Sequence, residues 1–215
     1  MENFDIYTVT GEEEFVDGNK SLGFNMIDFW RFQFPNIYDY HGELAEFIVA
    51  KALGKDRADN KDYWTRYDIS YTDSKQRELR IEIKASAYYH SWQTVDSKIS
   101  QQRTFGISKS HSSYDDSSAR LAGQEVEHKE DILERPNDLY VFCLNTGNTR
   151  EEAYTLDVSH WEFYIVPTYI LNEKCGDNKT ISLSKIHSLG FEKVRFEDIR
   201  EQVESVADDI FSKRK

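Results

Sequence analysis

The sequence has few cysteines and no long apolar segment. Its 2 cysteines, Cys143 and Cys175, are too few for a disulfide framework and form no zinc-ligand pattern. No apolar run reaches the ~20 residues that a membrane-spanning helix needs. The chain also opens without the basic and apolar regions of a secretory signal. These absences predict a cytoplasmic protein with no contact with the membrane.

Basic residues are outnumbered by acidic ones. The chain has 27 Lys and Arg against 39 Asp and Glu, and its formal net charge is −12. Because binding to a phosphate backbone depends on positive charge, this balance excludes a general nucleic-acid coat protein. A local basic groove or a bound metal ion still permits an acidic chain to bind nucleic acid. The length of 215 residues and the lack of internal repeats predict one domain over residues 1–215.

Alternation of polar and apolar residues from 66 to 85 predicts a β-hairpin. The apolar positions are Tyr67, Ile69 and Tyr71 in the first strand and Leu79, Ile81, Ile83 and Ala85 in the second. Polar residues 72–77 supply the turn. A short central loop sets Ile69 opposite Ile81, and it sets Asp68 opposite Glu82 on the other face. A slip of one residue would turn every apolar side chain to the wrong face, so the pattern constrains the register.

Charged side chains gather on the polar face of this predicted hairpin. Asp68 and Glu82 face each other, and Lys84 follows Glu82 on the same face. Opposed like charges are unfavourable, so the pair favours a cation between them. Mg²⁺, or Mn²⁺ in its place, suits carboxylate oxygens together with a substrate phosphate. The pattern therefore predicts a metal site for phosphodiester hydrolysis, with Lys84 beside the ion and not among its ligands.

Asp68 on one strand and Glu82-Ile83-Lys84 on the next hydrophobic strand resemble the PD-(D/E)xK nuclease superfamily. Tyr67 stands where that pattern has a proline, and the resemblance covers only residues 40–86. It implies an α/β fold of the restriction-endonuclease-like type, with a mixed central β-sheet flanked by α-helices. It further implies that Asp68, Glu82 and the Ile83 carbonyl hold the metal, that Lys84 orients the attacking water, and that cleavage leaves 5′-phosphate ends.

The Glu-x-Lys triplet is not specific by itself. A second one, Glu127-His128-Lys129, lies in a polar segment to which we assign no chemistry. The competing interpretation of the predicted site is a solvated sheet face with an alternating charge pattern.

Residues 39–53 are predicted to form a helix before the hairpin. Asp39 suits its N-cap and Gly54 its C-terminal end. The apolar stripe would comprise Tyr40, Leu44, Phe47, Ile48 and Ala52. Glu43 and Glu46 both lie off that stripe, so either could face the site. The resemblance, in which this helix reads Gly-x-x-x-Glu, favours Glu46 as a supporting group that acts through water.

Basic and aromatic residues follow the hairpin and suggest a groove for DNA. The predicted nucleic-acid-binding residues are Ser86, Trp92, Gln93, Lys98, Arg103 and Lys109. The competing interpretation is that the aromatic side chains are core and the lysines solvated. Residues 112–137 are predicted to be a polar excursion that orders over substrate. Residues 1–38 are predicted to be an arm whose clustered aromatics serve core packing or an oligomer contact.

The second half of the chain completes the predicted sheet. Residues 138–144 and 161–166 are almost wholly apolar, as expected of central strands buried on both faces. A helix over 168–174, a helical turn ending at Gly190 and an amphipathic helix over 196–213 would cover the sheet.

The function predicted from these features is that of a Mg²⁺-dependent deoxyribonuclease acting on DNA, with a homodimer as the default state. One alternative is a catalytically inactive nucleic-acid-binding or regulatory protein of the same fold. The other is a domain that binds a small molecule or another protein.

Overall fold

The computed structural model describes residues 10–36, 40–55, 66–90, 103–111 and 131–213, in two compact units, 1–40 and 41–215. In the first unit, β1 (Glu14–Asp17) and β2 (Lys20–Asn25) form an antiparallel hairpin that leads into α1 (Met26–Gln33). The side chain of Asn25 accepts a hydrogen bond from the Asp28 amide, and the Asp28 carboxylate accepts one from the Asn25 amide. This reciprocal cap explains where α1 begins.

The second unit contains a mixed four-stranded sheet in the order β3-β4-β8-β9. Its strands are β3 (Ile69–Thr72), β4 (Glu78–Ala87), β8 (Leu139–Asn145) and β9 (Trp161–Pro167). The pairs β3–β4 and β8–β9 are antiparallel, whereas β4 and β8 are parallel. This architecture confirms the predicted mixed α/β class.

The predicted hairpin register is confirmed within β3 and β4. Ile69 pairs with Ile81, and Tyr71 pairs with Leu79, all four being buried. Strand β8 is buried along its whole length, as its apolar run predicted, and β9 is buried except at Glu162.

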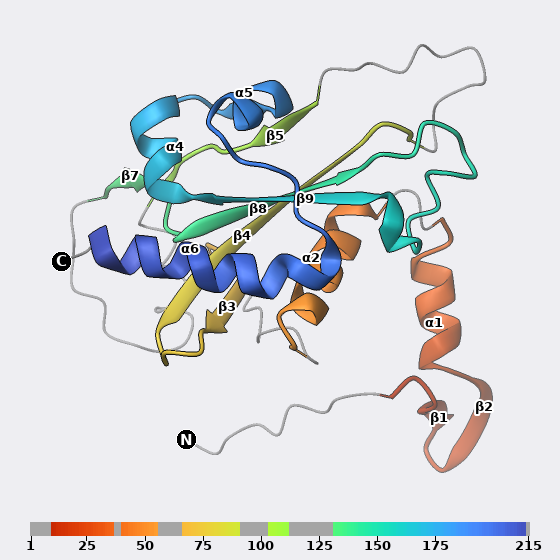
Figure 1. Ribbon diagram of the computed structural model, residues 1–215. Helices are drawn as coiled ribbons and strands as arrows, with labels where there is room; N and C mark the ends of the chain where they lie inside the picture. The colour runs from red at the N-terminus through yellow and green to blue at the C-terminus, as the bar shows by residue number, and fades with distance from the viewer. Residues whose placement is uncertain (1–9, 37–39, 56–65, 91–102, 112–130, 214–215) are drawn as a thin grey trace, which may run out of the picture. The chain divides into compact units, whose positions relative to one another are not determined.

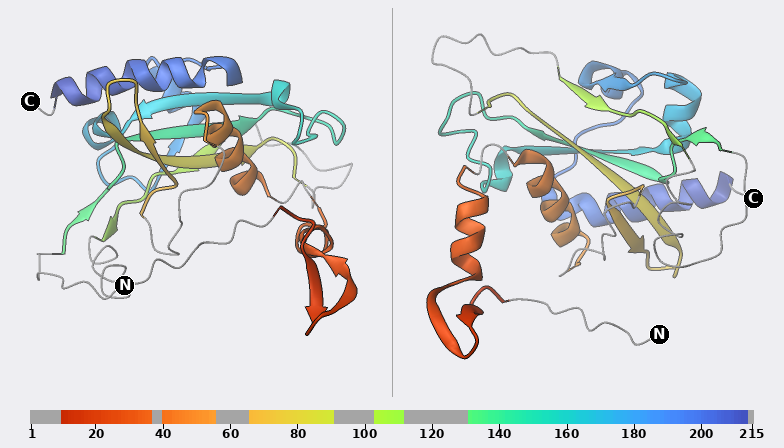
Figure 2. Two further views of the ribbon diagram at one scale, coloured as in Figure 1. Left: turned by 90° about the horizontal axis from the view of Figure 1, so that it is seen from below. Right: turned by 180° about the vertical axis from the view of Figure 1, so that it is seen from behind.

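Helices and a two-stranded antiparallel ribbon cover the two faces of the sheet (Figure 1). On one face, α2 (His41–Ala52) and α6 (Ile199–Lys213) pack against apolar side chains of all four strands. On the other face, side chains of β8 and β9 pack with α4 (Thr168–Cys175), α5 (Leu183–Ser188), and the ribbon of β5 (Thr104–Gly106) and β10 (Thr180–Ser182). The left view of Figure 2 shows α6 and β5 on opposite sides of the sheet. The short 3₁₀ helices Val158–His160 and Phe196–Asp198 precede β9 and α6.

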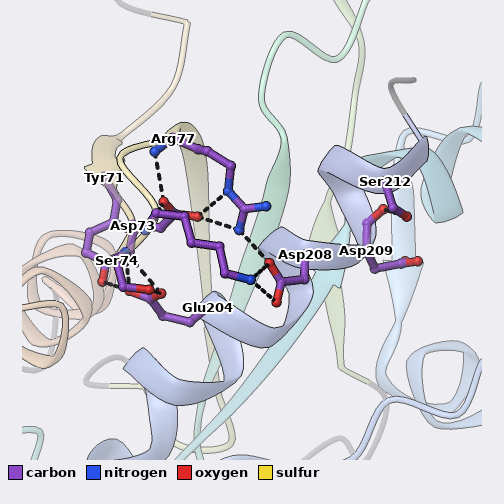
Figure 3. Close-up of polar contacts among 9 residues, drawn as sticks. Tyr71, Asp73, Ser74, Arg77, Glu204, Asp208, Asp209 and Ser212 are labelled. Atoms are coloured by element: carbon purple, nitrogen blue, oxygen red, sulfur yellow. Dashed lines mark hydrogen bonds and ion pairs between the residues drawn. The ribbon is translucent and has the colours of Figure 1, made fainter.

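The predicted amphipathic C-terminal helix is confirmed, and its acidic side is bonded to the hairpin turn (Figure 3). Glu204 accepts a hydrogen bond of 2.7 Å from the Tyr71 hydroxyl. Asp208 accepts bonds of 2.6 Å from the Lys75 ammonium and 2.7 Å from the Arg77 guanidinium. These contacts hold the closed end of the hairpin against α6.

The apolar stripe predicted for α2 is wrong at one position. Phe47 is 59% exposed. The buried residues of the helix are His41, Ala45, Ile48 and Val49. The face that meets the sheet is therefore turned away from Phe47. Gly54 has a φ of +79°, as expected of a helix-ending glycine, and Asp39 lies outside the described residues.

The last residues of the predicted excursion belong to the core. Residues 135–137 are buried, while 112–130 lie outside the described part of the chain. Arg135 donates hydrogen bonds to the Ile107 carbonyl at 2.7 Å, to Asn172 Oδ1 at 2.8 Å and to the Asn178 carbonyl at 3.1 Å. Its guanidinium thus joins the entry to β8 to the covering layer. Within the described ranges, none of the helices has the length and hydrophobicity to cross a bilayer.

Candidate active site

Asp68 lies beside the ladder of the hairpin and not directly opposite Glu82. The regular pairing begins at Ile69, which faces Ile81, and the Asp68 amide also donates to the Ile81 carbonyl, at 3.0 Å. The amide of Asp68 is therefore bonded to Ile81 and not to Glu82, and the direct opposition predicted from the register is not formed.

The Asp68 carboxylate contacts the main chain of the Glu82-Ile83-Lys84 segment. Its Oδ2 accepts a hydrogen bond of 2.7 Å from the Ile83 amide. In an extended strand, the N–H and C=O of one residue point toward the same neighbouring strand. The Ile83 carbonyl therefore faces the edge of β4 at which Asp68 lies.

Glu82 and Lys84 share the opposite face of β4 from Ile81 and Ile83, because side chains alternate along a strand. The Lys84 ammonium forms an ion pair with Glu82 Oε1. The Glu82 side chain is 17% exposed and that of Lys84 35% exposed, so both are partly shielded from water. A charged pair at the edge of a buried sheet face can act on a ligand that approaches from solvent.

Burial, followed by the neighbouring Asp68 carboxylate, raises the pKa of Glu82 from 4.5 to about 7. The Lys84 ammonium opposes the shift, and the Glu46 carboxylate adds to it. The single positive charge of Lys84 is thus opposed by three carboxylates, those of Asp68, Glu82 and Glu46. This excess of negative charge suits a divalent cation.

The structure distinguishes between the two glutamates of α2. Glu46 is half-buried, and its charge acts on Glu82. Glu43 is exposed. Glu46 is therefore the helix carboxylate that lies within electrostatic range of the site.

The donor set fits Mg²⁺. Among the described residues, no group of three or more His, Cys, Asp and Glu side chains is placed to hold a metal ion. The predicted set instead contains two carboxylates, Asp68 and Glu82, and one main-chain oxygen, that of Ile83. Mg²⁺ commonly binds through one or two carboxylates and takes its remaining ligands from water and substrate phosphate.

Tyr140 is a neighbour of the site that sequence reasoning missed. It pairs with Glu82 across β4 and β8 and is buried. Burial, together with the Glu82 and Asp68 charges, raises the pKa of its phenol well above the usual range, so the ring stays neutral. The buried ring of Tyr140 shields one side of Glu82 from water. The apolar run around it indicated only a core strand.

The predicted nucleic-acid-binding residues differ in their burial and in their contacts. Ser86 is half-buried on the face that carries Lys84. Arg103 is buried, donates to the Tyr88 carbonyl at 3.0 Å and stacks over the Tyr88 ring at 4.5 Å. Lys109 forms an ion pair of 2.7 Å with Asp177. Trp92, Gln93 and Lys98 lie outside the described residues.

The site brings together acidic oxygens for a hard cation, an ammonium group and a buried phenol. Such a set can polarise a phosphate ester and activate water beside it. No family model, curated protein or solved structure matches the chain. Functional assignment therefore rests on this geometry.

Proposed function

We propose that the chain is a metal-dependent deoxyribonuclease with a restriction-endonuclease-like fold, acting as a restriction-type or DNA-processing endonuclease. The observation that carries the proposal is the 2.7 Å hydrogen bond from the Ile83 amide to the Asp68 carboxylate. That bond joins Asp68 to the Glu82-Ile83-Lys84 segment, and these are the two parts of the pattern that resembles the PD-(D/E)xK superfamily. The mixed sheet with α2 against it supports the same assignment.

Each polar group has a role in this proposal. Asp68, Glu82 and the Ile83 carbonyl would hold Mg²⁺ or Mn²⁺. When bound, the ion supplies Lewis-acid chemistry that activates water and neutralises charge on the phosphate. Lys84 orients the attacking water and offsets the charge that develops in the transition state. Glu46 supports the site through water, and Tyr140 excludes solvent beside Glu82.

The test is cleavage of supercoiled plasmid and bacterial genomic DNA with Mg²⁺ or Mn²⁺, with EDTA as the metal-free comparison. Lys84→Ala is expected to lower the cleavage rate by about 100-fold or more, since it removes a charge that acts in the transition state. Asp68→Asn is expected to abolish metal-dependent cleavage. The new ends should accept ligation directly, because they carry 5′-phosphates.

The matched control is Lys193→Ala. Lys193 forms a 2.7 Å ion pair with Glu162 of β9, so this variant also breaks a Lys–Glu pair on the sheet. Its cleavage rate should equal that of the wild type. Cleavage that survives both Lys84→Ala and Asp68→Asn would overturn the proposal. DNA binding without cleavage by the wild type would instead indicate an inactive protein of the same fold.

A further inference from the structure

A short antiparallel ribbon lies beside the segment that leads into Asp68. It consists of β6 (Ser110–His111) and β7 (Leu133–Glu134). Arg66, which precedes Asp68 by two positions, holds both strands: its Nε and Nη2 donate to Ser110 at 3.3 and 3.2 Å, and its Nη1 lies 3.3 Å from Glu134 Oε1. The Arg66 side chain is only 4% exposed, so its guanidinium acts as a buried tie between the ribbon and the site.

A second attachment joins the ribbon to the strand next to Glu82. Directly after β7, the buried guanidinium of Arg135 ties the chain to the layer that covers the sheet. Two residues later, the side chain of Asn137 donates to the Leu139 carbonyl of β8 at 2.9 Å and to the Thr168 hydroxyl at 3.1 Å. The ribbon is thus bonded to the segment that leads into Asp68, and β7 runs directly into the buried entry to β8.

His111 of β6 forms a hydrogen-bonded pair with Asp131, which precedes β7 by two residues. His111 Nδ1 lies 2.7 Å from Asp131 Oδ2, and the His111 side chain is 56% exposed. A carboxylate on Nδ1 fixes the orientation of an imidazole ring and directs Nε2 to the other side. When the ring is protonated, Nε2 donates a charge-assisted hydrogen bond to an anion. In the described part of the chain, charged groups next to the pair in sequence or bonded to its neighbours include Arg66 and Glu134 at Ser110, and Lys109 with its partner Asp177.

We infer that His111 is a substrate-binding residue, whose Nε2 contacts a backbone phosphate of the DNA strand that the Asp68–Glu82 site cleaves. This inference rests on the proposed function. His111 follows Ser110, which Arg66 ties to the segment before Asp68, so the contact falls on a phosphate flanking the scissile one. In a chain of net charge −12, affinity for a phosphate backbone must come from cations placed in this way along the strand.

An exposed His–Asp pair can also be a surface ion pair with little effect on stability. The chain supplies a matched control for that interpretation: His160 Nε2 lies 3.7 Å from Oδ2 of Asp157, at the 3₁₀ helix before β9, with side-chain exposures of 35% and 50%. Both pairs join an imidazole to an aspartate at the surface, but only His111 lies on the ribbon that Arg66 ties to the segment before Asp68.

The experiment measures binding of a fluorescein-labelled DNA duplex by anisotropy at pH 6, over a series of salt concentrations. A Lys84→Ala background keeps the DNA uncut. His111→Ala is expected to weaken binding by about 3- to 10-fold and to lower the slope of log K against log salt by about 1, the signature of one lost phosphate contact. His160→Ala should change neither quantity. In the cleaving protein, His111→Ala should raise KM with little change in kcat.

Two further measurements separate the outcomes. Thermal unfolding checks that His111→Ala folds, and Asp131→Asn, which keeps the ring but loosens its orientation, should weaken binding in the same direction. Equal affinity and salt slope for His111→Ala and His160→Ala would show a surface ion pair only and overturn the inference, leaving the nuclease proposal in place. Absence of DNA binding by the parent protein would contradict the proposed function itself.

Discussion

At Glu82, burial and neighbouring carboxylates act together on one ionisable group. The pKa of its side chain rises from 4.5 to about 7. Below the lower value, Glu82 is protonated in both the folded and the unfolded chain and has no effect on pH dependence. Between the two values the folded chain keeps a proton that the unfolded chain has lost, so stability falls as the pH rises. Above about pH 7, ionisation of the buried Glu82 side chain destabilises the folded chain to its full extent.

Glu82→Gln should therefore stabilise the protein at pH 8 relative to pH 4. One unit of pKa shift corresponds to about 1.4 kcal/mol, so the gain is expected to reach a few kcal/mol. Urea unfolding of the variant and the wild type at both pH values measures it. Glu173→Gln, at an exposed Glu–Lys pair, is the control and should show no such gain. A gain from Glu82→Gln that is equal at pH 4 and pH 8 would contradict the prediction.

At the scale of the element, the β3–β4 hairpin is held by its turn as well as by its ladder. Asp73 is buried at the turn, where it accepts hydrogen bonds from the amides of Lys75 and Arg77 and from the Arg77 guanidinium. Arg77 also reaches Asp208 of α6 at 2.7 Å. Burial opposes ionisation of Asp73, but the bonds from Arg77 and Lys75 outweigh it and lower the pKa of the carboxyl.

Asp73→Asn should destabilise the protein by about 2–3 kcal/mol, because it leaves the Arg77 guanidinium without its buried acceptor. Asp208→Asn, at the exposed end of the same network, should cost less than about 1 kcal/mol. Since the folded-state pKa of Asp73 is depressed, its contribution is present above the ordinary pKa and is lost as the pH falls. Urea unfolding at neutral and acidic pH tests both points. Equal costs for the two variants at neutral pH would refute this account of the turn.

At the scale of the whole molecule, the first unit stands out because it exposes aromatic side chains. No residue of α1 is buried. Among its described residues, the exposed aromatic side chains are those of Phe15, Phe24, Phe29, Phe32 and Phe34, with Phe32 at 83%. A two-stranded hairpin and one short helix bury too little apolar surface to be stable by themselves in water. Apolar surface of this kind favours association, and the homodimer stays a prediction.

Replacement of Phe29 and Phe32 by Ser should therefore convert a dimer to a monomer. Light scattering coupled to size-exclusion chromatography, over a range of protein concentrations, measures the mass. Phe47→Ser is the matched control, because Phe47 is an exposed phenylalanine on α2 of the other unit. A wild type that stays monomeric at every concentration, or a dimer that the double variant leaves intact, would contradict the prediction.

Local periodicity in the sequence was sufficient to predict the strands of the sheet and the register of the β3–β4 hairpin. Alternation sets Ile69 against Ile81, and the apolar runs identify β8 and β9, because these patterns depend on residues close together in the chain. The same reasoning misplaced Phe47. A helical wheel marks an apolar arc, but docking against the sheet decides which part of that arc is buried.

The groups that surround the candidate site come together only in the tertiary structure. The Asp68 carboxylate accepts a hydrogen bond from the Ile83 amide, a contact that strand alternation does not predict. The raised pKa of Glu82 depends on burial and on the charge of Glu46, which belongs to a separate helix. Arg66 meets Ser110 across a long stretch of chain. Side-chain periodicity is local, whereas electrostatic environment and contacts between distant segments exist only after the elements have packed together.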